Sequence, residues 1–227
     1  MRLRALALLF LAVLATAGCG GDEAQPLTLE QRVLTAEDAP GSKPDPVEQR
    51  QQTASLEEFL TTLKEVAVDP DPETTAEVFR EAGFRGAILD ARFFGETHSP
   101  HAPHVFSSVI QLESDDGAQS ASDWLHADSL KPCPRTCAVR ISEFDVGGIS
   151  GARGIRRSQS AEDIERLGQE GDVPFESYTV LFGDGPFAYS VDLSGPPGSV
   201  SEDQASEIAH AFHGRVEGAP PPDETSG

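Results

Sequence analysis

The sequence predicts a single α+β domain of two layers, in which an antiparallel sheet carries helices packed on one face. Two observations support this fold class. Strand-like segments follow one another without a helix between them, which favours antiparallel pairing because a parallel pair needs a long crossover. Amphipathic helical segments flank these pairs, and each offers one apolar face to a sheet. The 227 residues are ample for one hydrophobic core.

Two helices are expected before the first long strand. In SLEEFLTTLKEV, Ser55 and Glu58 have capping-box spacing, and apolar residues then recur at the helical period. In DPETTAEVFREAGF, Asp71 suits the N-cap, Pro72 the first helical position and Gly83 the C-terminal cap.

Three more helical segments follow. GAQSASDWLHADSL, over 117–130, predicts a helix that ends before Pro132, and SAEDIERL predicts a turn or two. The last helix is expected to begin after Ser201 and to stop at Gly214. The inward positions of the two longer helices are Ala118, Ala121, Trp124 and Leu125, and then Ala205, Ile208, Ala209 and Phe212.

Six strand-like segments form three successive pairs. The first pair is 85–94 and 105–113, and the second is AVRISEFDV with ISGARGIRRS. The third pair flanks GDG at 183–185, the strongest hairpin signal in the chain. Aromatic residues on these strands are expected mainly in the core, although an open sheet face would let some line a cleft for a lipid or glycan. They are Phe93, Phe94, Phe106, Phe182, Phe187 and Tyr189.

The N-terminus has the layout of an export signal. Arg2 and Arg4 precede an apolar run that is too short for a permanent transmembrane helix. Small residues then lead to Cys19, and ATAG-Cys19 resembles a bacterial lipobox. The sequence therefore predicts diacylglycerol on Cys19 and a lipid-anchored protein on the outer face of the cytoplasmic membrane.

These features divide the chain into four parts. A lipoprotein signal peptide covers 1–18, and a tether from lipidated Cys19 covers 19–28. One α+β domain is expected over 29–216, irregular in places up to about residue 54, and a disordered tail over 217–227. Leu29, Val33 and Leu34 are apolar enough to dock the irregular part on the domain.

Three cysteines are an odd number for an exported chain. Lipidation of Cys19 leaves Cys133 and Cys137 for one disulfide. The alternative is a redox-active pair, but redox motifs usually place two residues between the cysteines and CPRTC has three. A structural disulfide is the expectation.

Charge limits the classes of partner. The formal net charge is −21, with 38 acidic and 17 basic residues. Nucleic acids and anionic lipid surfaces would repel such a chain, so no nucleic-acid partner is expected.

The segment HSPHAPH, residues 98–104, is the one candidate metal site. His98, His101 and His104 are suitable ligands for zinc or copper, with Glu96 as a fourth. The two prolines favour an extended form, which would string the imidazoles along one edge about 9 Å apart. A solvated loop without cofactor is therefore the expectation, and a zinc or copper site is the alternative.

Arg153, Arg156 and Arg157 form the densest positive segment of this acidic chain. Guanidinium groups bind phosphate and carboxylate bidentately, so the three residues are a candidate anion-binding site. Pairing with carboxylates on neighbouring strands is the expectation, and anion binding is the alternative.

The chain has no recognisable catalytic motif. Ser150 in GGISGARG does not have the spacing of a G-x-S-x-G elbow, and no serine has lysine three residues later. A non-enzymatic protein is the expectation. A hydrolase whose site has no sequence motif is the alternative.

Several segments together resemble a known group of proteins. They are the lipobox, VLTAEDAPG (33–41), SSVIQLESDDGAQSASDWL (107–125), the cysteine that follows, and the final hairpin and helix. The chain resembles small cell-wall lipoproteins of high-GC Gram-positive bacteria, which are similar to extracellular sensor domains of membrane kinases. The resemblance implies a sensor-like domain that binds an envelope ligand in a cleft, and it supplies no catalytic residues.

Overall fold

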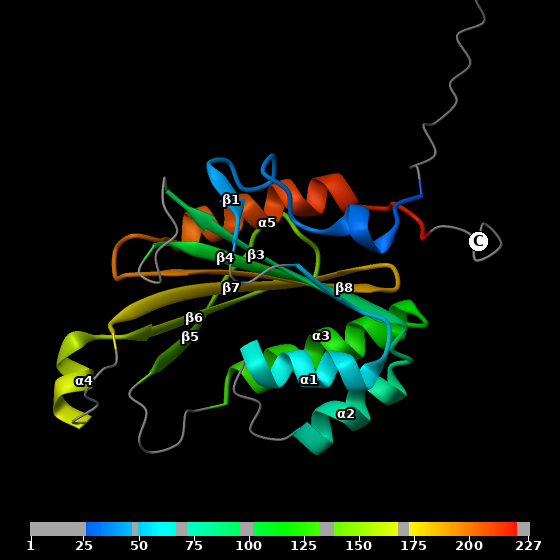
Figure 1. Cartoon of the computed structure of the whole chain (residues 1–227), viewed down its shortest axis with the longest axis horizontal. Helices are drawn as coiled ribbons and strands as arrows, with labels where there is room; N and C mark the ends of the chain where they lie inside the picture. The colour runs from blue at the N-terminus through cyan, green and yellow to red at the C-terminus, as the bar shows by residue number, and fades with distance from the viewer. Residues whose placement is uncertain are drawn as a thin grey trace, which may run out of the picture.

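The computed structural model describes residues 26–46, 50–66, 72–95, 102–131, 139–167 and 173–221 (Figure 1). The first half of this part contains the short helix η1 (Leu29–Arg32), strands β1 (Ser42–Pro44) and β2 (Gln51–Thr53), helices α1 (Leu56–Val66) and α2 (Pro72–Glu81), and strands β3 (Gly86–Phe94) and β4 (His104–Gln111). The second half contains α3 (Asp115–Ser129), β5 (Arg140–Phe144), β6 (Arg153–Gln159), α4 (Ala161–Leu167), β7 (Phe175–Asp184), β8 (Phe187–Gly195) and α5 (Glu202–Val216).

The described strands form one sheet in which every pair is antiparallel. The strand order is β1-β3-β4-β8-β7-β6-β5, and β2 also pairs with β3. The predicted antiparallel α+β fold is therefore confirmed.

Helices cover both faces of the sheet, whereas one covered face was expected. Helix α5 lies on one side, and α1, α2 and α3 lie on the other (Figure 1). We call the first side the α5 face and the second the α3 face. The reason lies in strand alternation, because Tyr189, Val191 and Leu193 of β8 pack towards α5 while Ala188 packs with α3.

The larger hydrophobic core lies on the α5 face. Ala205, Ile208, Ala209 and Phe212 of α5 are buried there, as predicted. Phe182 stacks on Tyr189 with ring centroids 4.9 Å apart, and Phe212 meets both rings edge-on. Burial of such rings is a major contribution to the stability of a domain.

The smaller core lies on the α3 face, at one end of the sheet. Phe59 of α1 and Phe79 of α2 are fully buried against Phe84. Ala118 and Ala121 of α3 are buried as predicted, and Trp124 meets Phe79 edge-on at 6.0 Å. This core includes Ala87, Ile110, Leu112 and Ala188 from the sheet region. The helices α1, α2 and α3 therefore pack where this face is apolar.

The segment before β1 docks on the α5 face. Val33 and Leu34 are buried, as expected, and Leu29 is partly buried beside them. Asp38 accepts hydrogen bonds from Thr35 N (2.8 Å) and from Arg215 Nη2 (2.7 Å). Arg215 thereby joins the end of α5 to this segment.

The two ends of the described chain lie side by side. Leu27 N donates a hydrogen bond to Pro220 O at 3.1 Å, and both ends leave the domain at the same corner (Figure 1). The fully buried Arg32 spans the two ends, since its guanidinium donates to the carbonyl oxygens of Leu27, Ala219 and Pro220.

Most element boundaries follow the sequence signals, although β6 begins at Arg153, four residues after the predicted start at Ile149. Helix α2 begins at Pro72 as predicted, and Gly83 has the positive φ (72°) expected of a C-terminal cap. Helix α5 continues through Gly214 to Val216, because Gly214 keeps helical geometry and the buried Val216 extends the apolar face. Strands β1 and β2 were not predicted, since three residues are too few for a period to be recognised.

Candidate functional site

The α3 face is polar beyond the part that the helices cover. Following the strand register, Arg157, Ser177, Ser194 and His104 lie opposite one another on β6, β7, β8 and β4. Two residues further along the strands, Thr179, Asp192 and Phe106 form a parallel row. We call these seven residues the polar rows.

The geometry of a sheet fixes the size of the polar rows. Neighbouring strands are about 4.8 Å apart, so the row from Arg157 to His104 spans roughly 14 Å. The two rows are separated by two residues along each strand, or roughly 7 Å. The polar rows are therefore long enough for an extended ligand, which would contact the partly exposed side chains, since Ser177 and Thr179 are buried.

Hydrogen bonds hold the side chains of the polar rows in place. Thr179 Oγ1 donates to Asp192 Oδ2 at 2.5 Å. Ser194 Oγ lies 2.8 Å from His104 Nε2, and Nδ1 of the same ring lies 3.3 Å from Ala102 O. If Nδ1 carries the proton, it donates to the carbonyl and Nε2 accepts from the serine. Phe106 meets the His104 ring edge-on at 5.1 Å.

Strand β6 divides the three candidate anion-binding arginines between the two faces of the sheet. Arg153 and Arg157 lie on the α3 face, whereas Arg156 pairs in register with Tyr178 on the α5 face. Arg156 Nη2 donates to Glu176 Oε1 at 2.9 Å. The Gly198 N–H and then the Arg156 guanidinium hold the pKa of Glu176 below its ordinary value. Arg156 thus takes part in pairing between neighbouring strands.

Arg153 belongs to a charged network with α3. Its Nη2 lies 2.6 Å from Asp123 Oδ1, and its Nη1 lies 3.1 Å from His126 Nδ1. A guanidinium only donates, so Nδ1 accepts and this contact requires a neutral His126 ring. Nε2 of the same ring lies 2.9 Å from Glu143 Oε1. Arg153 is therefore occupied by partners from its own chain.

Arg157 differs from the other two arginines. Its Nη2 donates to Ser129 O at the end of α3 (2.8 Å), and it forms no ion pair with any described residue. Of the three candidate arginines, Arg157 is the one that belongs to the polar rows.

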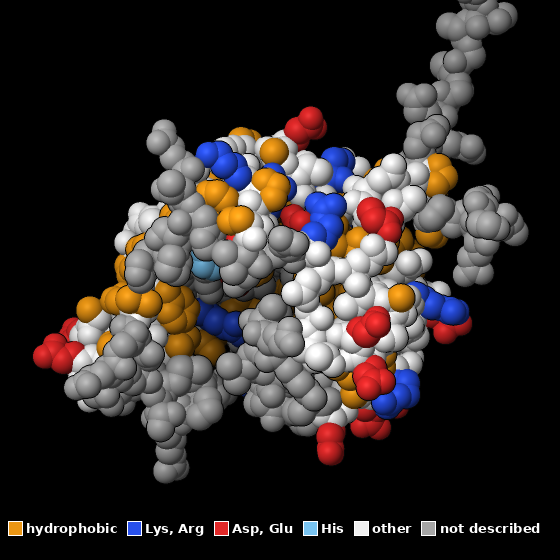
Figure 2. Space-filling view, in the orientation of Figure 1, with side chains coloured by type: hydrophobic (Ala, Val, Ile, Leu, Met, Phe, Trp, Pro, Cys, Tyr) orange, Lys and Arg blue, Asp and Glu red, His pale blue; other side chains and the backbone are white. Residues whose placement is uncertain are grey.

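Space-filling representation shows a hollow on this side of the molecule. In Figure 2 it lies over the position of β6 and β7 in Figure 1, between α4 and the group of α1, α2 and α3. Lys or Arg side chains lie inside it, and hydrophobic side chains border it towards α4. A hollow that contains both kinds of side chain is typical of a ligand site.

The candidate metal site lies mostly outside the described residues. His98, His101 and Glu96 are outside them, while His104 begins β4 and is bonded to Ser194. In the described ranges, no three His, Cys, Asp or Glu side chains are grouped as metal ligands would be.

Cys19, Cys133 and Cys137 are also outside the described part, so the expected lipidation and disulfide stay predictions.

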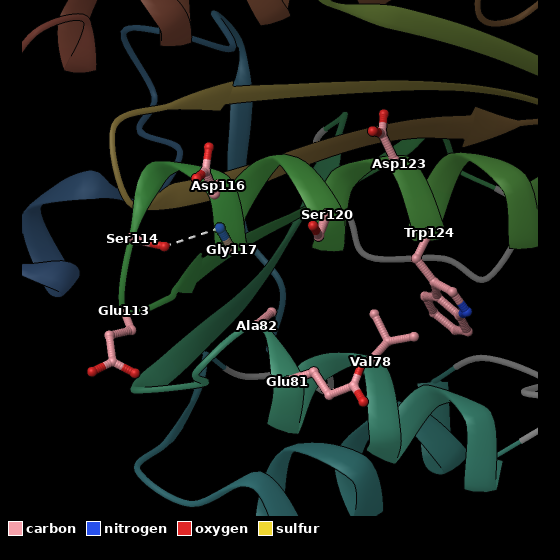
Figure 3. A pocket seen from close by; sticks show the side chains of 10 residues that line it. All are labelled: Val78, Glu81, Ala82, Glu113, Ser114, Asp116, Gly117, Ser120, Asp123 and Trp124. Carbon is pink, nitrogen blue, oxygen red and sulfur yellow. Dashed lines mark hydrogen bonds between the residues drawn. The ribbon is translucent and has the colours of Figure 1, made fainter.

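A second depression of about 640 Å³ lies between α2 and α3 (Figure 3). Val78 and Trp124 point into it from the two helices, whereas Asp116, Asp123 and Glu113 point away from it. Asp123 and Glu113 are paired, with Arg153 and Arg85. The depression follows from the close approach of two helices, and it brings no reactive groups together.

Sequence reasoning missed Asp192, Thr179, Ser177 and Ser194, although the signal was present. In FAYSVDLS (187–194), apolar residues alternate with Ser190, Asp192 and Ser194. Period-two alternation indicates one covered and one solvated face of a strand. The sequence of β8 therefore indicated that the polar side of this strand is not covered by the core.

The fold defines the chain as an antiparallel α+β domain with helices on both faces. Its structure is similar to the crystal structure of the extracellular domain of PknH from Mycobacterium tuberculosis. The TM-score is 0.52 at 14% identity, and the match covers 85% of this chain and 98% of that one. No protein-family model and no curated protein matches the chain. None of the described helices has the length and apolar character to cross a bilayer.

Proposed function

We propose that the protein is a lipid-anchored lipoprotein on the outer face of the cytoplasmic membrane. Its domain binds an envelope ligand at the polar rows and acts as a sensor-like module without catalysing a reaction. The anchoring part rests on the lipobox at Cys19 and on the short apolar run before it. The fold that it shares with the extracellular domain of PknH supports a location outside the cytoplasm.

The polar rows are the observation that carries the binding role. A sheet face that only supports the fold is expected to be apolar and covered, or to carry scattered solvated side chains. Here hydroxyl groups, a carboxylate and a guanidinium line four neighbouring strands, with Phe106 near one end of the rows and Arg157, bonded to the end of α3, at the other. A few well-placed polar groups beside apolar side chains are what ligand sites share.

A native mass spectrum of the protein, purified from its own membrane, tests this function. We expect a bound molecule that is lost in Ser194→Trp, because the indole would fill the space above the rows. Ser142→Trp is the control, since Ser142 is an exposed residue on β5. A molecule retained in Ser194→Trp would place the site elsewhere. A stoichiometric metal ion that is lost in His101→Ala would instead favour a metal-binding lipoprotein.

A hydrolase is the second candidate, because Ser194 and His104 are bonded in the arrangement of a nucleophile and its base. In that case Ser194 Oγ would attack an ester carbonyl while His104 Nε2 takes its proton and passes it to the departing alcohol. Water would then release the acyl group from Ser194. A fluorophosphonate reagent distinguishes the two functions. We expect no label on Ser194, and labelling that disappears in His104→Ala would support the hydrolase.

A further inference from the structure

We infer that the ligand of the polar rows is a carbohydrate, bound along the line from Arg157 to His104. This inference rests on the proposed binding function and names the chemical class of its ligand. An envelope lipid is the competing ligand class, and its acyl chains would need an apolar surface.

The hydrogen-bonding groups of the polar rows suit a polyhydroxylated ligand. Asp192 is an acceptor, Arg157 is a donor, and the partly exposed Ser194 hydroxyl acts as both. Sugar hydroxyls also donate and accept, so they can pair with each of these groups. An acyl chain would cover them without pairing, and each group left unpaired costs about 1–3 kcal/mol. The rows therefore favour a sugar over an acyl chain.

Phe106 adds the apolar contact that sugars use. It lies directly opposite Asp192 in the strand register, so the Cβ atoms of the two residues are about 5 Å apart. A sugar ring carries hydroxyls at its edge and C–H groups on its face. A ring seated here would place C–H groups on Phe106 while its hydroxyls bond Asp192.

The site is ordered before a ligand arrives. Thr179 fixes the Asp192 carboxylate, and Ser194 and the Ala102 carbonyl fix the His104 ring. The Ser129 carbonyl at the end of α3 holds Arg157. Side chains that are already immobilised lose little entropy on binding, which favours a weakly hydrophobic ligand such as a sugar.

Arg157 also allows an acidic sugar. It has no carboxylate partner among the described residues, so its guanidinium can donate to a uronate carboxylate or to neutral hydroxyls. Both kinds of sugar therefore belong in the test.

The experiment titrates the full lipidated protein in detergent with maltohexaose, cellohexaose, mannohexaose, arabinohexaose and hexagalacturonate by isothermal calorimetry. We expect at least one to bind and Asp192→Asn to weaken it about tenfold or more, which corresponds to about 1.4 kcal/mol for a charged acceptor. Arg157→Gln should weaken it similarly. Arg166→Gln on α4 is the control, because Arg166 pairs with Asp163 away from the rows.

Each other outcome overturns the inference. Binding that survives Asp192→Asn would place the sugar elsewhere, and no binding by any of the five would exclude this ligand class. If no sugar binds but the native spectrum shows a lipid that is lost in Ser194→Trp, the carbohydrate inference fails and the binding function stands. If neither a sugar nor any other molecule binds, both fail.

Discussion

Arg32 shows how a single buried residue joins the two ends of the domain. Its side chain is fully buried, and it forms no ion pair with any described residue. Carbonyl oxygens and the Tyr189 hydroxyl (2.8 Å) accept its protons, and its guanidinium lies 3.8 Å from the centroid of the Phe187 ring. Burial raises the pKa of Tyr189 to about 12, so the phenol remains neutral beside the cation. The charge is thus stabilised by dipoles and a ring face.

Replacing Arg32 by alanine should destabilise the domain strongly. The change leaves buried carbonyl groups and the Tyr189 hydroxyl without their donor, so we expect a loss of about 3 kcal/mol or more. Urea denaturation measures it. Arg85→Ala is the matched control, since Arg85 forms an exposed pair with Glu113 and should cost less than about 1 kcal/mol. Equal losses for the two variants would contradict this role of Arg32.

Asp163 makes the stability of the domain depend on pH in the acidic range. The Ser160 hydroxyl, followed by Arg166 and Arg140, lowers the pKa of Asp163 from 3.8 to about 2, against the opposing effect of burial. A lowered folded-state pKa means that the ionised carboxylate stabilises the folded state above the unfolded-state value. This contribution is lost as the pH falls from about 4 to about 2.

Asp163→Asn should remove the part of the pH dependence of stability that comes from this carboxylate. We expect the wild type to exceed the variant in free energy of unfolding by a constant amount above about pH 5, and by less as the pH approaches about 2. Urea denaturation of both proteins at a series of pH values measures the difference. A difference that is unchanged across this range would show that another group is responsible.

At the scale of elements, the contact of α2 with α3 depends on one glycine. A Cβ atom on Gly117 would lie 2.4 Å from Ala82 O, at the end of α2. The backbone cannot yield easily there, because α3 is packed on the sheet through Ala118 and Ala121. The absence of a side chain at residue 117 therefore allows the close approach of the two helices.

Replacing Gly117 and Gly214 by alanine should have opposite effects on the stability of the domain. Gly117→Ala is expected to destabilise the domain by about 1–3 kcal/mol, because the new methyl group is overpacked. Gly214→Ala should stabilise it by about 0.5–1 kcal/mol, since the position is helical and open within 4 Å. Thermal unfolding of both variants checks the signs. A stabilising Gly117→Ala would show that α2 can move away from α3.

Local patterns predicted most elements but did not predict which faces are covered. Capping residues and the helical period placed α1, α2, α3 and α5, and GDG placed the β7–β8 hairpin. The use of both sheet faces depends on which helix reaches which face. The chain connections between elements decide this, and the spacing of apolar residues within one element does not. The same reason explains the arginines, because only the strand assignment of β6 reveals that Arg156 faces away from Arg157.

The candidate site was less predictable than the fold. Single serines and aspartates are common in an acidic chain, so Asp192 or Ser194 alone carries no signal. Their importance arises when four strands place them opposite one another. The prediction for the aromatic residues was closer to the structure. Phe182, Phe187 and Tyr189 are core residues, while Phe106 is a partly exposed member of the polar rows.

At the scale of the whole molecule, the proposed anchor would hold the domain near the bilayer. Seven residue steps separate Cys19 from Pro26, the first described residue, so the chain between them reaches at most about 25 Å. The corner that holds both ends of the described chain would then face the membrane (Figure 1).

Cys19→Ser should separate the protein from the membrane or block its processing. A serine cannot accept diacylglycerol through a thioether, so we expect the variant in the soluble fraction or at the higher mass of the precursor. Membrane fractionation with mass spectrometry measures both. Cys133→Ser is the control and should remain membrane-bound. A processed Cys19→Ser that still fractionates with membranes would contradict the lipid anchor.

The hydrogen bond between Leu27 and Pro220 has a consequence for engineering the topology of the chain. Since these residues are neighbours, a short linker could join them, and new termini could be opened at Gly185 in the β7–β8 turn. Such a circular permutant would keep the same sheet and the same polar rows. An anchor attached at its new N-terminus would hold the domain by the β7–β8 turn, and the permutant would thereby present another side of the same binding surface to the bilayer.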